Sequence, residues 1–217
     1  MKVPMEKTKM NQVVQESYFL NLLRAPTVLH HVETLSEAGR LMLVTEYCEC
    51  GDLKQFLSRQ QEPMAEDFVQ NVLLHLLTAV HACHAQLVAH RDIKPANVLI
   101  SANGVFKLAD FGVARFIVDV AETLAGTPLY MAPEVVLGLP YHQAGDVYSL
   151  GCLLYELCTL TLPCVASDMQ SLKDRIGVLV RAEVAPSVSA KGEARRHRSP
   201  LRRRSSGSSG CAPPLRG

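Results

Sequence analysis

A ten-residue stretch near the middle of the chain, HRDIKPANVL, constrains the fold and the chemistry more than any other part of the sequence. It places a carboxylate at Asp92, an ammonium group at Lys94 and a carboxamide at Asn97 in one short loop, directly before an apolar run. These groups suit chemistry on a phosphate ester. A carboxylate can receive a hydroxyl proton, a cation can neutralise a phosphoryl group, and an amide oxygen can bind Mg²⁺.

A predicted hairpin follows this loop. Asn103-Gly104 is typical of a tight turn, and it separates two apolar runs at 98–100 and 105–108. The hairpin would carry the catalytic loop at one end and bring Asp110 back beside it. Both acidic side chains are therefore expected in one cleft.

Two further motifs follow in order, Asp110-Phe111-Gly112 and Ala132-Pro133-Glu134. Together with His90-Arg91-Asp92 they resemble the metal-loop, activation-segment and catalytic-loop signatures of eukaryotic protein kinases. Three linked motifs are far more specific than any one tripeptide. Lys94 indicates the serine/threonine type, and the segments GTPLYMAPE and SLGCLLYELCTL resemble the never-in-mitosis-A-related kinases.

The resemblance implies an α+β fold with the two lobes of a protein kinase. It predicts a partial small lobe at residues 1–48, a partial, mainly helical large lobe at 49–180 and a disordered tail at 181–217. The small lobe is expected to be incomplete, because no glycine precedes Gly39 and the glycine-rich loop is missing. The large lobe is expected to lack its last helices, because the likeness ends near Ile176.

The charge distribution separates the body of the chain from its tail. Residues 1–180 carry 13 Lys and Arg against 19 Asp and Glu, whereas residues 181–217 carry 9 against 2. The tail is rich in Arg, Ser, Gly and Pro, which favours disorder. Its arginines leave nucleic-acid binding or nuclear import open. The preferred interpretation is an alternative or misread transcript end, with no nucleic-acid partner.

No apolar run reaches the roughly 20 residues of a membrane span, and the N-terminus does not resemble a signal peptide. The seven cysteines lack the paired spacing of a metal or disulfide framework. We therefore expect a cytoplasmic protein with reduced thiols and no membrane partner, with a nuclear location left open by the basic tail.

Apolar periodicity predicts helices at 11–24 and 66–86 and strands at 28–33 and 41–46. His81 and His84, on the second helix, are expected to lie on its surface rather than to bind a metal. The segment 146–157 is apolar almost all round, which predicts a fully buried helix.

Within the resemblance, four residues carry the chemistry. Asp92 would accept or orient the proton of the substrate hydroxyl, and Lys94 would neutralise charge on the γ-phosphoryl group. Asn97 would bind the second Mg²⁺, and Asp110 would chelate the Mg²⁺ that bridges the β- and γ-phosphates. The resemblance thus implies ATP and Mg²⁺ as cofactors.

The same resemblance implies nucleotide-binding residues in the first half of the chain. Glu16 would pair with Lys2 and hold it against the phosphates. A solvated lysine is an equally good interpretation of Lys2, and an exposed helical glutamate is the alternative for Glu16. Thr45 would be the gatekeeper, and backbone groups near Glu46 and Cys48 would bond the adenine.

Two more residues are implied near the nucleotide. Leu99 would lie beneath the adenine ring. Asp52 would either meet the ribose or cap the helix that follows it, and capping is the safer interpretation.

A regulatory set is also implied. Thr127 would bond Asp92 and Lys94. Thr123 would accept phosphate from an upstream activating kinase, and this phosphate would pair with Arg91; an ordinary surface threonine is the alternative for Thr123.

Two buried groups would support the loop. His90 would be a structural histidine, and Asp146 would anchor the catalytic-loop backbone.

These inferences predict a protein serine/threonine kinase that transfers the γ-phosphoryl group of ATP to Ser or Thr of a protein substrate. Its activity is expected to be reduced by the missing segments, because positioning supplies much of the catalysis. The alternative is a catalytically inactive kinase fragment that acts as a binding or regulatory module.

Overall fold

The structure is a computed structural model, and it describes residues 7–117, 127–164, 166, 168 and 170–176. Helices and short antiparallel strand pairs occur in separate groups along the chain, as is typical of an α+β fold. The elements in chain order are α1 (Lys7–Leu22), β1 (His31–Glu37), β2 (Arg40–Thr45), α2 (Leu53–Leu57), α3 (Glu66–Ala85), β3 (Val88–Ala89), η1 (Pro95–Asn97), β4 (Val98–Ile100), β5 (Phe106–Leu108), β6 (Arg115–Phe116), η2 (Pro128–Tyr130), α4 (Pro133–Val136) and α5 (Gln143–Thr159).

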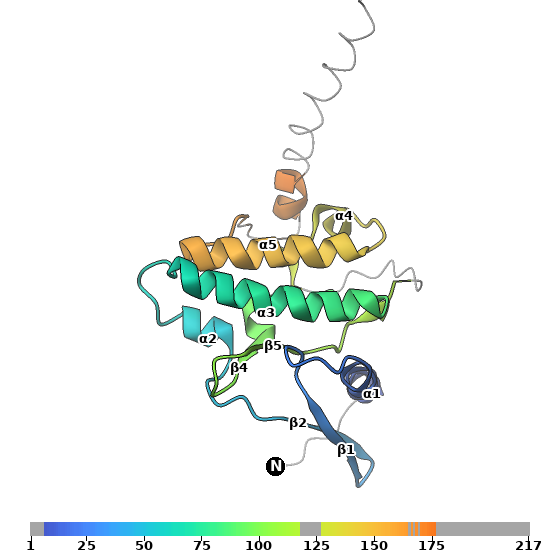
Figure 1. Ribbon diagram of the computed structural model, residues 1–217. Coiled ribbons are helices and arrows are strands. Elements are labelled where there is room, and N and C mark those ends of the chain that lie inside the picture. Colours follow the sequence, from blue (N-terminus) through green and yellow to red (C-terminus); the bar gives the residue numbers. More distant parts are fainter. Residues whose placement is uncertain (1–6, 118–126, 165, 167, 169, 177–217) are drawn as a thin grey trace, which may run out of the picture. The chain divides into compact units, whose positions relative to one another are not determined.

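The described strands form three two-stranded antiparallel sheets, β1-β2, β3-β6 and β4-β5. The two long helices α3 and α5 pack side by side, while α1 packs against the β1-β2 hairpin (Figure 1). The short β4-β5 hairpin lies against α3. The site residues discussed below sit on or beside this hairpin.

Helix α3 confirms the predicted helix at 66–86. Its buried side chains recur at the spacing of one helical face, and they join the main hydrophobic core. Leu77 lies off this buried face, and 47% of it is exposed.

The predicted helix at 11–24 is confirmed as α1, which begins earlier, at Lys7, and ends at Leu22. Phe19, Leu20 and Leu23 are buried in the main core. Val14 and Tyr18 are more than half exposed, so the apolar residues of this helix occupy two faces rather than one stripe.

The first predicted strand, 28–33, is shifted. Strand β1 begins at His31, because the residues just before it pair with the end of β5 instead. The N–H of Leu108 donates to Thr27 O at 2.8 Å, and the N–H of Leu29 donates to Leu108 O at 2.9 Å. The β1-β2 turn uses Ala38 and Gly39, both at positive φ, which matches the twist of a tight hairpin.

The segment 146–157 lies in α5, but the prediction of an all-round buried helix is wrong. Leu150, Leu153 and Leu157 are buried in the core, whereas 55% of Val147 and 46% of Tyr155 are exposed. Helix α5 packs against α3 and also contacts η2, while Val147 and Tyr155 lie on an exposed part of its surface.

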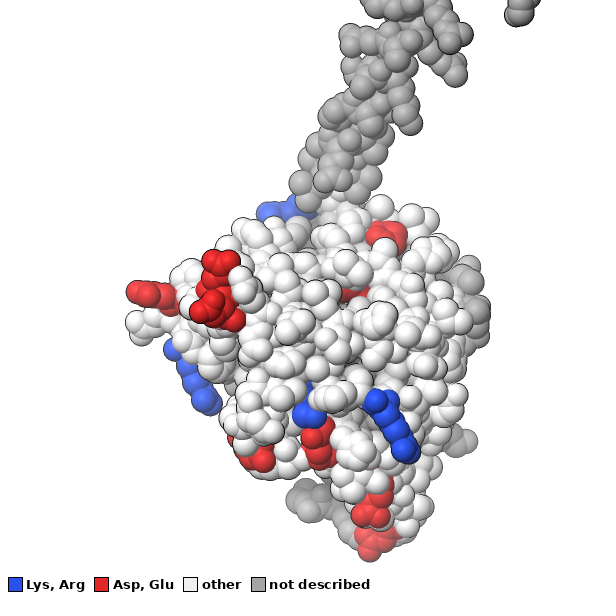
Figure 2. All heavy atoms as spheres, in the orientation of Figure 1, with Lys and Arg blue, Asp and Glu red and all other residues white. Residues whose placement is uncertain are grey.

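On the face shown in Figure 2, the described Lys, Arg, Asp and Glu side chains are dispersed among uncharged ones. No helix in the described ranges is long and apolar enough to cross a membrane. The predicted boundary between residues 48 and 49 stays a prediction, and the predicted tail at 181–217 lies outside the described residues.

Candidate active site

The β4-β5 hairpin brings the two ends of the predicted site together. Val98 pairs with Leu108, and the N–H of Ala109 donates to Asn97 O at 2.9 Å. Asn97 and Asp110 therefore lie at the same end of the hairpin. The short-range pairing encoded by the turn thus accounts for their proximity.

Three predicted catalytic side chains form one hydrogen-bonded cluster. Lys94 Nζ donates to Asp92 Oδ2 at 2.6 Å, and Asn97 Nδ2 donates to the same oxygen at 3.0 Å. Asn97 Nδ2 also donates to the backbone O of Asp92 at 2.9 Å. These bonds hold the Asp92 carboxylate in one orientation against Asn97, the last residue of the short helix η1.

Thr127, from a later segment of the chain, completes this cluster. Its N–H and its hydroxyl donate to Asp92 Oδ1 at 2.8 and 2.9 Å, and Lys94 Nζ donates to its hydroxyl oxygen at 2.6 Å. The predicted contacts of Thr127 with Asp92 and Lys94 are confirmed. Its regulatory role stays a prediction.

The surroundings of Asp92 favour its ionised form. Burial acts to raise its pKa, but the hydrogen bonds from Lys94 and Thr127 outweigh burial and lower the pKa below its ordinary value. Asp92 is therefore a carboxylate at neutral pH, the form that accepts hydrogen bonds.

A buried carboxylate on α5 anchors the backbone of the loop, as predicted. Asp146 accepts the N–H of His90 at 3.0 Å and the N–H of Arg91 at 2.9 Å. Its pKa is lowered although burial acts to raise it, because His84 and other donors stabilise the charge. The prediction of His84 as a plain surface histidine is wrong, since its Nε2 lies 2.8 Å from Asp146 Oδ2.

His90 is confirmed as a buried residue. Its Nε2 lies 3.0 Å from Ala109 O, and its ring packs edge-on against Phe111 with centroids 4.7 Å apart. Burial lowers its pKa, which favours the neutral ring. The histidine thereby links the catalytic loop to the turn that carries Asp110.

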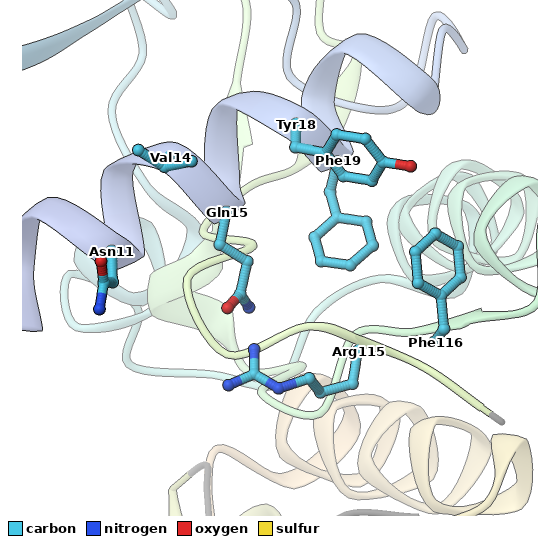
Figure 3. Close-up of a pocket in the computed structure, with 7 residues that line it drawn as sticks. All are labelled: Asn11, Val14, Gln15, Tyr18, Phe19, Arg115 and Phe116. Carbon is cyan, nitrogen blue, oxygen red and sulfur yellow. The ribbon is translucent and has the colours of Figure 1, made fainter. Parts of the chain in front are cut away.

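Helix α1 contacts this turn through Gln15, a residue that the sequence analysis missed. Gln15 Nε2 donates to Ala114 O at 2.6 Å and to Gly112 O at 3.2 Å. Figure 3 shows Gln15 pointing from α1 toward the loop that carries Arg115, within a pocket of about 420 Å³. No local pattern distinguishes this glutamine from its neighbours, because its partners lie almost a hundred residues away.

Glu16 lies beside the same turn. Burial, followed by the negative charge of Asp110, raises the pKa of Glu16 to about 6, and a hydrogen bond with the Phe111 backbone partly offsets this. The fold therefore brings Glu16 close to Asp110, a contact that was not predicted from the sequence. Its predicted partner Lys2 lies outside the described residues, as does Thr123.

The predicted adenine-binding segment follows β2. Thr45 is half-buried, and its hydroxyl donates to Glu46 O at 3.2 Å. The carboxylate of Glu46 accepts the His30 N–H at 2.7 Å and pairs with Lys107 Nζ at 3.0 Å. This side chain therefore fastens β2 to β5, a structural contact that the sequence analysis did not anticipate.

The remaining nucleotide-site residues lie near this segment. Cys48 is buried, and burial raises the pKa of its thiol, which suits a side chain without chemistry. Asp52 Oδ1 accepts the Gln55 N–H at 2.8 Å, which confirms that it caps α2. Asp52 and half-buried Leu99 form an isolated antiparallel β-bridge through their backbones, so these two residues of the predicted nucleotide site are adjacent.

The donor set suits Mg²⁺. No cluster of three or more His, Cys, Asp and Glu that could hold a metal occurs in the described residues. A kinase-type site instead needs few protein oxygens, because phosphates and water complete the coordination. Asn97 binds Asp92 through its nitrogen, which turns its amide oxygen away, and exposed Asp110 offers a carboxylate at the same end of the hairpin. These two residues fit the ion.

The fold and this site define the class of the protein, and sequence comparison agrees. The chain belongs to the protein kinase domain family, whose model matches residues 1–200. Proteins of this family generally use ATP and Mg²⁺.

Individual relatives are serine/threonine kinases of the Nek type. The chain is 35% identical over 193 residues to Serine/threonine-protein kinase Nek5 of Homo sapiens, covering 87% of this chain and 27% of that protein. It is 36% identical over 185 residues to Nek2 of Mus musculus, covering 79% and 42%, and 38% identical over 162 residues to Nek3 of Mus musculus, covering 73% and 32%. The chain thus spans less than half the length of these relatives.

Proposed function

We propose that this chain is a protein serine/threonine kinase that transfers the γ-phosphoryl group of ATP to a Ser or Thr hydroxyl of a protein substrate. The observation that carries the proposal is the closed cluster of Asp92, Lys94, Asn97 and Thr127. Two distant segments of the chain bring one ionised carboxylate and one ammonium group side by side, and Asn97 and Thr127 bond to them. The kinase relatives support the same reaction.

In this proposal Asp92 receives the hydrogen bond of the substrate hydroxyl and orients its oxygen for in-line attack. Its lowered pKa makes it an acceptor rather than a strong base. Lys94 already touches Asp92 and Thr127, so its charge is fixed beside the reacting oxygen. Thr127 bonds to both side chains, so it holds Asp92 and Lys94 in fixed relative positions. It also connects them to the segment that leads to Pro133.

Asn97 and Asp110 are the residues that would hold Mg²⁺. When bound, the ion would neutralise charge on the β- and γ-phosphates. The hairpin fixes the spacing of these two side chains through the Val98–Leu108 pairing. Asp110 has a φ of 63°, a conformation that costs a non-glycine residue about 1 kcal/mol or more and is often kept at functional sites.

The nucleotide base would lie between the β2 end and β4. We propose that backbone groups of Glu46 and Cys48 bond the adenine, with Thr45 as the gatekeeper and Leu99 beneath the ring. Glu16 would hold Lys2 against the phosphates. Asp52 is engaged as a helix cap, so any ribose contact would use its remaining lone pairs.

For regulation, we propose that phosphate on Thr123, added by an upstream kinase, binds Arg91. A double negative charge beside a guanidinium group forms strong charge-assisted hydrogen bonds and orders the segment that carries it. Arg91 directly precedes Asp92 in the catalytic loop, which supports this role.

The test is transfer of radiolabelled phosphate from ATP to a generic basic protein, followed by phosphoamino-acid analysis. At a limiting Mg²⁺ concentration, the wild-type chain should label serine and threonine, and Asp110→Asn should label neither. Asp67→Asn, an exposed acidic residue in the first turn of α3, is the matched control and should label normally. Equal labelling by wild type and Asp110→Asn overturns the proposal and favours a binding module without phosphoryl transfer.

A further inference from the structure

Asp146 accepts a hydrogen bond from Tyr141 that none of the kinase motifs described above predicts. Its two oxygens accept four donors in all. Oδ2 meets His90 N–H and His84 Nε2, while Oδ1 meets Arg91 N–H at 2.9 Å and the hydroxyl of Tyr141 at 2.7 Å. Tyr141 therefore shares an oxygen with the backbone of the catalytic loop.

The backbone held by that oxygen is strained. Arg91 has a φ of 73°, in the left-handed region that costs a non-glycine residue about 1 kcal/mol or more. Such a conformation persists only where the surroundings fix it. Asp146 Oδ1 fixes it through the Arg91 N–H, so the orientation of this carboxylate controls the start of the loop that carries Asp92.

Tyr141 also supports the side chain of Arg91. The guanidinium carbon lies 5.6 Å from the centre of the Tyr141 ring, within the range of a cation–π contact. One side chain thus touches the loop at two points, through its hydroxyl by way of Asp146 and through its ring directly.

Gly145 provides the space that this arrangement needs. A Cβ atom at residue 145 would come within 2.7 Å of Tyr141 Cζ and 2.8 Å of Cε2, which real structures do not show. Any other residue at 145 would therefore push the ring away from Asp146 and Arg91. Tyr141, Gly145 and Asp146 occur together in the sequence as Tyr-x-x-x-Gly-Asp. Their contacts can be recognised only in the folded structure.

We propose that Tyr141 is a positioning residue for phosphoryl transfer, which orients Asp146 and Arg91 and thereby the catalytic loop, and that Gly145 is required for its placement. The proposal rests on the kinase activity proposed above. Tyr141 touches neither nucleotide nor substrate in it, and acts only through these two residues.

The experiment compares Tyr141→Phe and Gly145→Ala in the full chain, with Tyr148→Phe as the matched control. Tyr148 lies on α5, and its hydroxyl bonds Cys152 of the same helix. Two quantities are measured: amide hydrogen exchange of His90 and Arg91, and kcat and KM for ATP and a basic peptide substrate.

Tyr141→Phe is expected to speed exchange of these two amides about tenfold, because one donor to their shared acceptor is lost. It should lower kcat about tenfold with the KM for ATP changed by less than about twofold, since loop geometry and not nucleotide contact is altered. Gly145→Ala should be more severe, because both contacts of the ring are lost. Tyr148→Phe should change neither quantity.

Unchanged exchange at the two amides in Tyr141→Phe overturns the inference, as does equal acceleration in Tyr148→Phe. An unchanged kcat in Tyr141→Phe, with wild type active, also overturns it. If the wild-type chain transfers no phosphate, the proposed function fails. The exchange measurement then still decides whether Tyr141 positions the loop.

Discussion

Thr127 and Asp92 are joined by two hydrogen bonds to a single oxygen, from the N–H at 2.8 Å and from the hydroxyl at 2.9 Å. The residues are far apart in sequence, so the chain between them must be folded for the bonds to form. The backbone bond is available to every residue except proline, whereas the hydroxyl bond depends on the side chain. Substituting the side chain therefore measures the contribution of the hydroxyl bond alone.

Thr127→Val should lower kcat by about 10- to 100-fold, because Asp92 and Lys94 both lose a partner and small misplacements of reacting groups are costly. Thr127→Ser keeps the hydroxyl and should stay near wild type. Steady-state kinetics on a peptide substrate measures the effect. A Val variant as active as the Ser variant would show that the hydroxyl does not position the carboxylate.

Glu16 makes stability depend on pH in a defined direction. Burial and the charge of Asp110 raise its pKa to about 6, so the folded state binds its proton more tightly than the unfolded state. The stabilisation is complete below the ordinary glutamate pKa, and it is lost as the pH rises through about 6. The melting temperature of Glu16→Gln relative to wild type should therefore increase between pH 4.5 and 7.

The control for this measurement is Glu33→Gln, an exposed position on β1. Its melting temperature relative to wild type should stay constant over the same pH range. If the melting temperature of Glu16→Gln relative to wild type is also constant over this pH range, Glu16 is not buried beside Asp110.

Gly151 offers a stabilising substitution. It lies inside α5, and a Cβ atom added there would meet no atom within 4 Å. Gly151→Ala should raise the free energy of unfolding by about 0.5–1 kcal/mol, because alanine loses less backbone entropy in a helix. Thermal denaturation should show a melting temperature higher by about 2 °C. A lower melting temperature would show that this face of α5 is occupied.

The central part of the site follows from local sequence. The Asn103-Gly104 turn and the flanking apolar runs define the β4-β5 hairpin, and the hairpin places Asn97 beside Asp110. Asp52 likewise caps α2 through a residue three positions away. These features could be predicted because their partners are close in the chain.

Other features depend on tertiary packing, and the sequence analysis missed them. Gln15 and Tyr141 acquire their roles only when α1 meets the loop after Phe111 and α5 meets the catalytic loop. His84 resembles any surface histidine until Asp146 is folded beside it. The exposed face of α5 shows the same limit, because apolar composition alone does not reveal which side a neighbour covers.

Single-turnover phosphoryl transfer, measured over a range of Mg²⁺ and ATP concentrations, reports nucleotide binding and transfer rate together. We expect Asp92→Asn to bind ATP within about threefold of wild type but to transfer phosphate at least about a hundredfold more slowly. We expect Asp110→Asn to require about tenfold or more Mg²⁺. Normal transfer by Asp92→Asn, or an unchanged Mg²⁺ requirement in Asp110→Asn, would contradict the proposed roles of these two residues.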